Sequence, residues 1–254
     1  MQLTDHPLAV FAASLCLLSI GAWMGAHLAK RRAPLQAERR DEFEVVRTAT
    51  LTLLALLIGF AFSMAISRYD QRKYYEEAEA NAIGTEYVRA DLLPGADAAK
   101  VRALLLSYLD QRIQFYEASD EDRLRQIRTE TDTLQAGLWA AVRAAAQSET
   151  SLLNLLTVEG MNDVLNSEGY TQFAWWNRIP GEAWALMLVM AFCCNVLVGF
   201  GATKIRSESV LLLILPLVVS IAFFLIADID SPRGGMVHVK PQNLHRLARS
   251  LRAS

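Results

Sequence analysis

A carboxylate cluster, Glu76, Glu77 and Glu79, is the group of side chains in this sequence that most resembles an acid–base site. Neighbouring carboxyl groups can donate and accept protons during catalysis. Here Arg72 and Lys73 precede the cluster at helical spacings, as in the pair Lys73 and Glu77. Opposite charges four residues apart are common partners on exposed helix surfaces. We therefore expect surface ion pairs at this cluster and no catalytic role.

No other group of residues has the spacing of a catalytic or metal site. The four histidines, His6, His27, His238 and His245, are scattered along the chain, and the three cysteines lie in apolar stretches. Neither set has metal-ligand spacing. A nucleophile elbow, a P-loop and a dinucleotide fingerprint are all missing from the sequence. We expect a protein that is not an enzyme, with no catalytic residues, no metal and no cofactor.

Four long windows of the sequence contain no Asp, Glu, Lys or Arg. They are Pro7–Ala29, Thr48–Ser67, Ala183–Thr203 and Ser209–Ala227, with 23, 20, 21 and 19 residues. A helix rises about 1.5 Å per residue, so about 20 apolar residues cross a bilayer core of about 30 Å. The chain is 53% hydrophobic with a mean hydropathy of +0.21. These features predict a multi-pass protein of the cell membrane, and we expect the bacterial inner membrane.

The polar segment between the second and third windows predicts a helical bundle. Pro94–Gly95 marks a turn, and Asp97 fits the N-cap of a helix over 98–117. Ser119, followed three residues later by Asp122, resembles a capping box that starts the next helix. The sequence "QSETSLLNLL" predicts the start of a further helix, and no run of residues has the pattern of a strand.

The same segment excludes nucleic acid as a partner. Residues 68–180 contain 12 Lys and Arg against 18 Asp and Glu, a net charge of −6. A phosphate-binding surface requires the opposite sign.

These patterns predict an all-α fold with four transmembrane helices and an extramembrane helical bundle inserted between helices 2 and 3. The expected segments are 1–67, with membrane helices 1 and 2 and a charged connector; 68–180, the bundle; 181–228, with membrane helices 3 and 4; and 229–254, the C-terminal tail. In the tail, Leu244, Leu247 and Leu251 with the neighbouring arginines predict either an amphipathic helix at the lipid headgroups or a solvated end.

One face of the second membrane segment combines hydroxyl and bulky apolar side chains. Its residues are spaced by three or four and so share one helical stripe: Thr52, Leu56, Phe60, Ser63 and Ser67. If several subunits placed this stripe around an axis, Leu56 and Phe60 would form an apolar constriction between more polar ends. Such constrictions gate ions by dewetting. The alternative is that the stripe packs against the first span or faces lipid.

For three polar residues in or near the other spans, we consider structural roles. Asp228 and Asp230 follow the fourth window, where they would form an acidic ring in an oligomer or cap the turn at Ser231-Pro232. Asn195 lies inside the third window, and we expect it to hydrogen-bond to a neighbouring helix.

Three stretches resemble one family of proteins. The runs "GFAFSMAISRYDQRKYYEEAEANAIGTEYVRADLLP", "NRIPGEAWALMLVM" and "ADIDSPRGGMVHV" are similar to the bestrophin-like group of multi-pass membrane proteins, in an order that covers about residues 48–240. The stretch "NDVLN" departs from that group, in which an acidic residue is usual near Asn166.

More distantly, the first of these runs resembles true bestrophins, which are pentameric ion channels with four spans per subunit and a helical intracellular part. The resemblance implies the same plan here, with a pore neck at Thr52, Leu56 and Phe60. It also implies that the helix leaves the membrane at Arg68 and Tyr69, so that the 68–93 extension, with Asp70 and Arg72, lines a vestibule. Thr52 is more polar than the residue usual in such necks.

Two functions therefore follow from the sequence. The first is a homo-oligomeric, pentameric ion channel with passive conduction, whose partners are other copies of itself, the lipid bilayer and small inorganic ions. The second is a non-conducting membrane scaffold or sensor whose helical domain binds a partner. A lipid-modifying enzyme is the least supported alternative, since the apolar windows contain almost no titratable groups.

Overall fold

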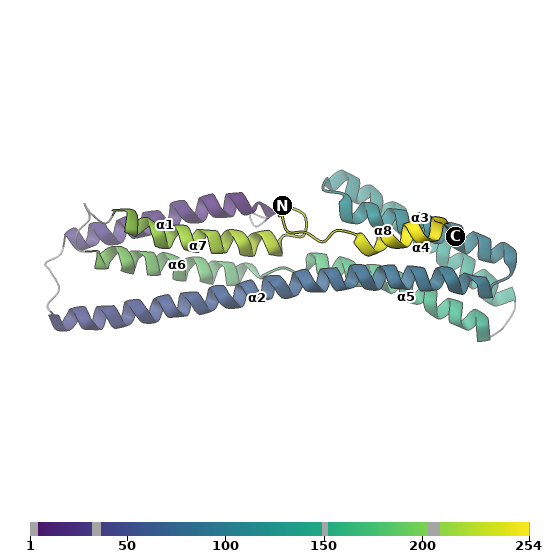
Figure 1. Ribbon diagram of the computed structural model, residues 1–254, viewed down its shortest axis with the longest axis horizontal. Coiled ribbons are helices and arrows are strands. Elements are labelled where there is room, and N and C mark those ends of the chain that lie inside the picture. Colours follow the sequence, from purple (N-terminus) through teal and green to yellow (C-terminus); the bar gives the residue numbers. More distant parts are fainter. Residues whose placement is uncertain (1–4, 32–36, 149–151, 203–208, 254) are drawn as a thin grey trace. The chain divides into compact units, whose positions relative to one another are not determined.

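The computed structural model describes residues 5–31, 37–148, 152–202 and 209–253, and no strand occurs among them. The α-helices are α1 (Pro7–Lys30), α2 (Ala37–Arg89), α3 (Gly95–Glu117), α4 (Glu121–Ser148), α5 (Leu152–Trp176), α6 (Gly181–Gly201), α7 (Ser209–Asp230) and α8 (Gln242–Ala253), and a short 3-10 turn, η2 (Ala90–Leu92), follows α2 (Figure 1). The predicted all-α fold is confirmed. Residues 32–36 of the expected connector and 149–151 before α5 lie outside the described residues.

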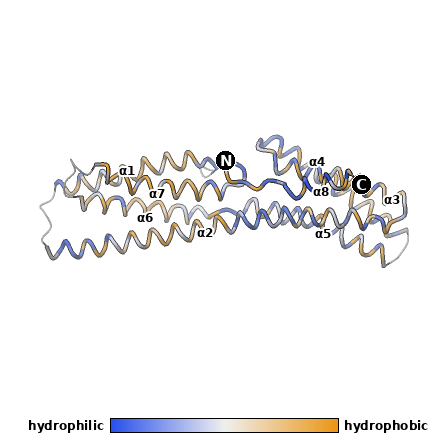
Figure 2. The backbone as a smooth tube through the Cα atoms, viewed as in Figure 1, coloured by the Kyte–Doolittle hydropathy of each residue, from blue (hydrophilic) through white to orange (hydrophobic). Residues whose placement is uncertain are grey.

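Four helical segments are long and apolar enough to cross a membrane. The first, second and fourth fall on α1, α2 and α7, and the third covers α5 together with α6. The four charge-free windows lie on α1, α2, α6 and α7, although the third window extends two residues past the end of α6. Figure 2 shows hydrophobic residues along these helices, and it shows α2 becoming more hydrophilic toward its C-terminal half. The predicted four-span arrangement is confirmed.

The chain divides into two compact units. The membrane unit contains residues 1–69 and 178–238, and the extramembrane unit contains residues 70–177 and 239–254. Each unit is built from two separate stretches of sequence, and α2 contributes residues to both.

The membrane unit depends on very close packing between α1 and α6. A Cβ atom added to Gly25 would overlap the backbone of Val196 and lie 2.8 Å from the backbone nitrogen of Phe200. A Cβ atom added to Gly199 would likewise overlap the backbone oxygen of Ala22. Small residues allow such approach of membrane helices, where van der Waals contact is the main source of association.

This close approach explains why the expected partner of Asn195 was wrong. Asn195 is fully buried, and its side-chain nitrogen donates to the carbonyl oxygen of Ala191, one turn earlier in α6, at 2.8 Å. Its side-chain oxygen has no hydrogen-bond partner among the described residues. At the closest approach to α6, α1 presents Gly21, Ala22, Gly25 and Ala26, and none of these residues has a side-chain donor.

In the membrane unit, α2 contributes one narrow face to the core. Leu54, Ala61 and Ala65 are buried in a cluster with residues of α1, α6 and α7, including Leu18, Met187 and Phe223. The helix contains no proline, and the hydroxyls of Thr50 and Thr52 donate to backbone carbonyls four residues earlier. These features allow α2 to continue without a break over 53 residues.

The extramembrane unit is an all-helical bundle whose core contains both aliphatic and aromatic residues. Fully buried side chains come from α3, α4 and α5, among them Leu105, Tyr108, Ile127, Leu138 and Met161. On α5, Trp175 packs edge-on against the rings of Phe115 and Tyr116.

Two helix caps differ from the predicted ones, by three residues at α3 and by one residue at α4. The N-cap of α3 is Pro94, and Asp97 lies in the first turn, where its charge still favours the helix dipole. At α4, the carboxylate of Asp120 accepts the backbone N–H of Arg123 at 2.9 Å, so Asp120 caps this helix and Ser119 does not. Both aspartate and serine are strong capping residues, and sequence spacing alone does not choose between neighbours.

The C-terminal tail forms the predicted amphipathic helix, but this helix belongs to the extramembrane unit, so its expected location at the lipid headgroups was wrong. Leu244 and Ala248 of α8 are buried, and Leu247 lies against Gly84 of α2. The apolar face of this amphipathic helix is therefore covered by protein.

Candidate pore-lining face and membrane-exit cluster

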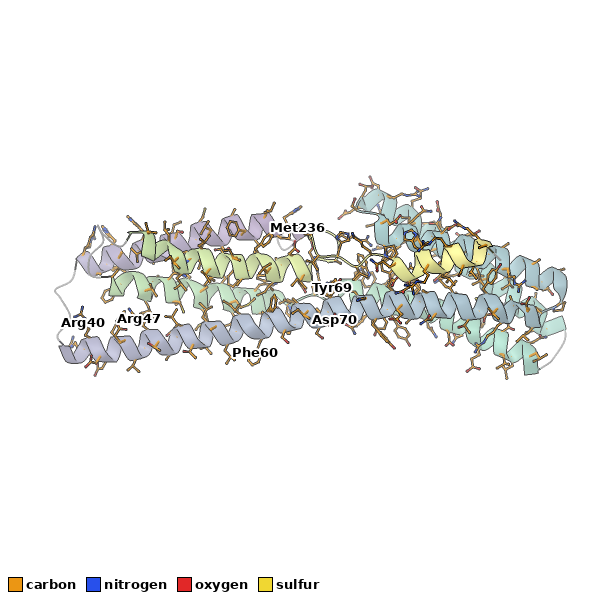
Figure 3. All side chains as sticks on the ribbon, in the orientation of Figure 1. Arg40, Arg47, Phe60, Tyr69, Asp70 and Met236 are labelled. Atoms are coloured by element: carbon orange, nitrogen blue, oxygen red, sulfur yellow. The ribbon has the colours of Figure 1, made fainter. Side chains whose placement is uncertain are left out.

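The five residues of the predicted stripe all lie on the exposed side of α2. Thr52, Leu56, Phe60, Ser63 and Ser67 are exposed, and the exposed fractions of the two large apolar side chains are 52% for Leu56 and 61% for Phe60. Figure 3 shows Phe60 projecting from the side of α2 that faces away from α6. In a single chain, Leu56 and Phe60 are therefore not covered by the other helices of the membrane unit.

The exposed surface of α2 is wider than this stripe. Phe62 and Ile66 lie on another part of the helix and are 37% and 39% exposed. At the N-terminal end, a broad open groove is lined by Glu44, Val45, Thr48, Ala49, Thr52, Leu53 and Leu56. Because Thr52 donates its hydroxyl to the carbonyl oxygen of Thr48, its polarity is partly satisfied within the helix.

The end of the membrane unit that includes Arg68 holds a cluster of charged groups. The Nη1 atom of Arg68 lies 3.9 Å from Oδ1 of Asp230, too far for a hydrogen bond. Both carboxylate oxygens of Asp230 accept the backbone N–H of Ile179 at 3.2 Å, and Arg178 forms an ion pair with Asp5. We refer to Asp5, Arg68, Arg178 and Asp230 as the membrane-exit cluster.

Asp228 organises the turn after α7. Its two carboxylate oxygens accept the backbone N–H groups of Met236 and Val237, at 2.7 and 3.0 Å. Asp228 and Asp230 are each only 2% exposed. Within this chain, both carboxylates cap backbone groups and neither is directed to solvent.

The expected vestibule residues separate into exposed and buried ones. Asp70 is exposed, together with Tyr74, Glu77 and Asn81, which follow it at spacings of three or four along α2. Tyr69 is half-buried. Arg72 is only 1% exposed, so this expected vestibule residue lies inside the extramembrane unit.

The buried face of α2 in the extramembrane unit is unusually rich in charge, and the expectation of surface ion pairs was wrong for two of its residues. This face consists of Arg72, Glu76, Glu79, Ile83, Glu86 and Ala90, at alternating spacings of four and three. That alternation is typical of a core-facing stripe, and it was the signal in the sequence that could have revealed the burial.

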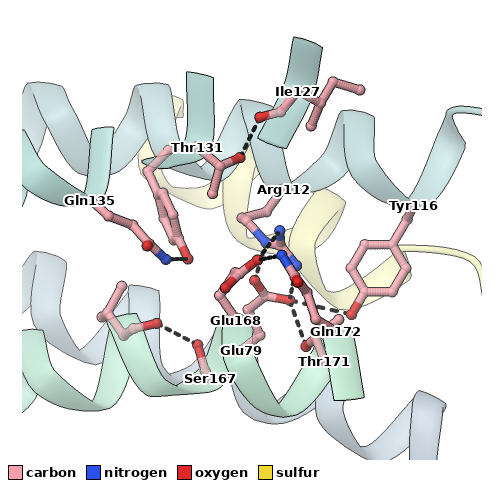
Figure 4. A network of polar contacts seen from close by, with 12 residues as sticks. Glu79, Arg112, Tyr116, Ile127, Thr131, Gln135, Ser167, Glu168, Thr171 and Gln172 are labelled. Carbon is pink, nitrogen blue, oxygen red and sulfur yellow. Dashed lines mark hydrogen bonds and ion pairs between the residues drawn. The ribbon is translucent and has the colours of Figure 1, made fainter. Parts of the chain in front are cut away.

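Glu79 lies at the centre of a buried network (Figure 4). It pairs with the guanidinium of Arg112, and its Oε2 accepts hydrogen bonds from Tyr116 at 3.3 Å and Thr171 at 3.2 Å. Burial raises the pKa of Tyr116, and the negative charge of Glu79 raises it further. This network joins α2, α3 and α5, and both carboxylate oxygens of Glu79 are engaged in it.

Glu76 caps the N-terminus of α8. Its Oε1 accepts the backbone N–H groups of Asn243 and Leu244 at 2.8 and 3.0 Å, and its Oε2 accepts the side-chain amide of Asn243 at 2.6 Å. Of the three clustered carboxylates, only Glu77 is exposed. Across the part of the chain that the structure describes, no group of three or more His, Cys, Asp or Glu side chains is placed to hold a metal ion.

These observations define an all-α membrane protein with a helical insert between its second and third membrane helices. The sequence profile of the Bestrophin-like domain matches residues 12–244, and the chain belongs to the Bestrophin-like family. A search among curated proteins gave no match.

Solved structures with the same fold include a bacterial Bestrophin homolog from Klebsiella pneumoniae. It is 13% identical, each chain is covered to 96%, and the TM-score is 0.67. Two single-residue variants of that homolog also match. One is 12% identical with a TM-score of 0.65, and the match covers 96% of this chain and 97% of the variant. The other is 11% identical with a TM-score of 0.64, and the match covers 94% of this chain and 96% of the variant. At these identities, the similarity establishes the shared fold.

Proposed function

We propose that this chain is the subunit of a homo-oligomeric ion channel, a pentamer, in which the exposed face of α2 lines a central pore. The observation that carries the proposal is the exposure of Leu56 and Phe60, at 52% and 61%, opposite the buried Leu54 and Ala61. Copies of α2 arranged around an axis would bring these side chains together as a neck. Ions would pass by passive conduction, and no cofactor is needed.

The polar residues around the neck favour a hydrated axis over a lipid-facing surface. Thr52, Ser63 and Ser67 share the exposed face with Leu56 and Phe60. A helix face turned to hydrocarbon gains nothing from hydroxyl groups, whereas a water-filled pore is lined by them at low cost. Membership of the Bestrophin-like family and the fold shared with bacterial Bestrophin homologs support the channel and the subunit plan.

The charges of the insert favour cations at the extramembrane side. Residues 68–180 have a net charge of −6, and Asp70 and Glu77 are exposed on α2. An acidic surface raises the local concentration of cations and lowers that of anions. Lys73, also exposed on α2, offsets part of this field.

We propose the cell membrane, specifically the bacterial inner membrane, as the location of the oligomer. Its partners would be other copies of the same chain, the surrounding lipids and small inorganic ions. The exposed Asp70 would lie in the vestibule, while Arg68 and Asp230 would fix the geometry at the membrane exit.

Two measurements test the proposal. The mass of the purified full-length protein in detergent is expected to be five times that of one chain after the bound detergent is subtracted. A monomer would contradict a central pore, since a single α2 cannot enclose one. The same oligomer in planar bilayers is expected to give single-channel currents. An oligomer that stays silent across voltages, pH values and salts would instead favour the scaffold or sensor.

A further inference from the structure

Glu86 is a buried carboxyl group whose hydrogen-bonding capacity is unused. It lies on α2 in the extramembrane unit and its exposed fraction is 0%. Neither of its carboxyl oxygens has a hydrogen-bond partner among the described residues. Buried polar groups are normally hydrogen-bonded, and an isolated buried charge costs far more than a neutral group. The site therefore favours the protonated, neutral form of Glu86.

Gly160 of α5 closes over this carboxyl group. A Cβ atom at Gly160 would overlap Oε2 of Glu86 and would lie 2.5 Å from Nη1 of Arg89. Both distances are measured to the same point, so the carboxyl group and the guanidinium are neighbours. The Nη1 atom of Arg89 nevertheless donates to the carbonyl oxygen of Leu156, at 3.4 Å, in the early part of α5.

The surrounding charges place the ionisation of Glu86 near neutral pH. Burial raises the pKa of Glu86 to about 8, Arg89 on the same helix lowers the value, and Asp163 on α5 raises it. On the adjoining turn η2, Asp91 is already paired with Arg102 of α3. Glu86 is thus neutral at pH 7 and becomes charged over a modest rise in pH.

We propose that Glu86 is a proton-controlled latch that holds the early part of α5 against α2. With Glu86 neutral, Arg89 stays on the carbonyl oxygen of Leu156, and α5 stays close to Glu86 of α2 at Gly160. When Glu86 releases its proton to solvent, the carboxylate attracts the guanidinium away from Leu156. The new negative charge also repels Asp163, so this part of α5 separates from α2.

Hydrogen–deuterium exchange of the full-length protein in detergent tests the latch without relying on ion conduction. Exchange is followed in peptides covering residues 153–163, and is corrected for the intrinsic effect of pH. Between one pH unit below and one above the pKa of about 8, the wild-type exchange is expected to rise by up to about tenfold per unit, the limit for release of one proton. Glu86→Gln stays neutral and is expected to remain protected throughout.

Glu159→Gln is the matched control because Glu159 is an exposed carboxyl group next to Gly160. It is expected to keep the wild-type pH response. If Glu86→Gln shows the same rise in exchange as the wild type, or if the wild type shows no rise, the latch is excluded.

Infrared spectroscopy of the wild type provides a test that needs no variant. The carbonyl stretching band of a protonated carboxyl group is expected at pH 7 and should disappear as the pH passes through about 8. Absence of that band at pH 7 would overturn the proposal.

Discussion

Asp230 at the end of α7 caps the start of α6, because both of its carboxylate oxygens accept the backbone N–H of Ile179 at 3.2 Å. The same carboxylate lies 3.9 Å from the guanidinium of Arg68 on α2. One buried side chain therefore connects three helices of the membrane unit.

Asp230→Ala is expected to lower the free energy of unfolding by about 1–3 kcal/mol, since it leaves a buried N–H group without its acceptor. Asp230→Asn keeps an acceptor oxygen and is expected to cost less. Thermal unfolding in detergent measures both, and Asp70→Ala, at an exposed site, serves as the control. Equal stability of all three variants would show that the cap contributes nothing.

Phe60→Ala is expected to raise single-channel conductance or open probability, because it removes the bulkiest side chain of the proposed neck. Phe62→Ala removes the same ring from a different part of the same helix and is expected to leave both quantities unchanged. The two variants are compared in planar bilayers under identical salt. If they change conductance equally, a different face of α2 lines the pore.

Asp70→Asn combined with Glu77→Gln is expected to reduce the permeability of cations relative to anions. A unit charge about 4 Å from an ion changes its energy by about 1 kcal/mol in water, which corresponds to roughly a fivefold change in the permeability ratio. The reversal potential in asymmetric salt measures this ratio. Asp132→Asn, at an exposed site on α4, should leave the potential at its wild-type value.

Arg112→Ala is expected to lower the free energy of unfolding by about 3–5 kcal/mol, because Glu79 is then a buried charge without its partner. The double variant Arg112→Met with Glu79→Met replaces both charges by apolar groups and is expected to be more stable than Arg112→Ala. Arg125→Ala breaks an exposed pair with Asp122 and should cost about 1 kcal/mol or less. A double variant as unstable as Arg112→Ala would argue against this account of the network.

The stability of the wild type is expected to fall as the pH rises from about 4.5 toward about 8. Glu86 has a pKa of about 8 in the folded protein against 4.5 as its ordinary value. In this range the unfolded chain has lost the proton that the folded protein retains, so raising the pH favours unfolding. The slope from this group is at most about 1.4 kcal/mol per pH unit. Glu86→Gln should remove that slope from chemical denaturation curves, whereas a slope that persists would assign it to other groups.

The membrane helices could be predicted because lipid imposes a simple rule on sequence. A span tolerates almost no charge, so the window Thr48–Ser67 marks the membrane part of α2 directly. The membership of the stripe with Leu56 and Phe60 follows from spacing alone, because α2 has no proline. That this stripe lines a pore stays a prediction. The family resemblance is confirmed by the match over residues 12–244.

The partners of the buried charges in the extramembrane unit could not be predicted in the same way. Glu76 and Glu79 lie in a charged stretch that is typical of a solvated helix surface. Only the fold shows that they bind Asn243 and Arg112. These partners lie 167 and 33 residues away in the sequence. Local spacing favoured the nearby Arg72 and Lys73, so it indicated the wrong partners. The burial of Arg72 was missed because this pairing drew attention away from the four-three spacing of the buried face.

The capping of α8 by Glu76 also constrains how the protein is made. The extramembrane unit needs residues 239–254, which are synthesised after all of the membrane unit, while the membrane unit needs residues 178–238 to join residues 1–69. Neither unit exists as one continuous stretch of sequence. Cutting the gene at the membrane boundary therefore yields no self-sufficient fragment, and translation must reach the α8 codons before the extramembrane unit is complete.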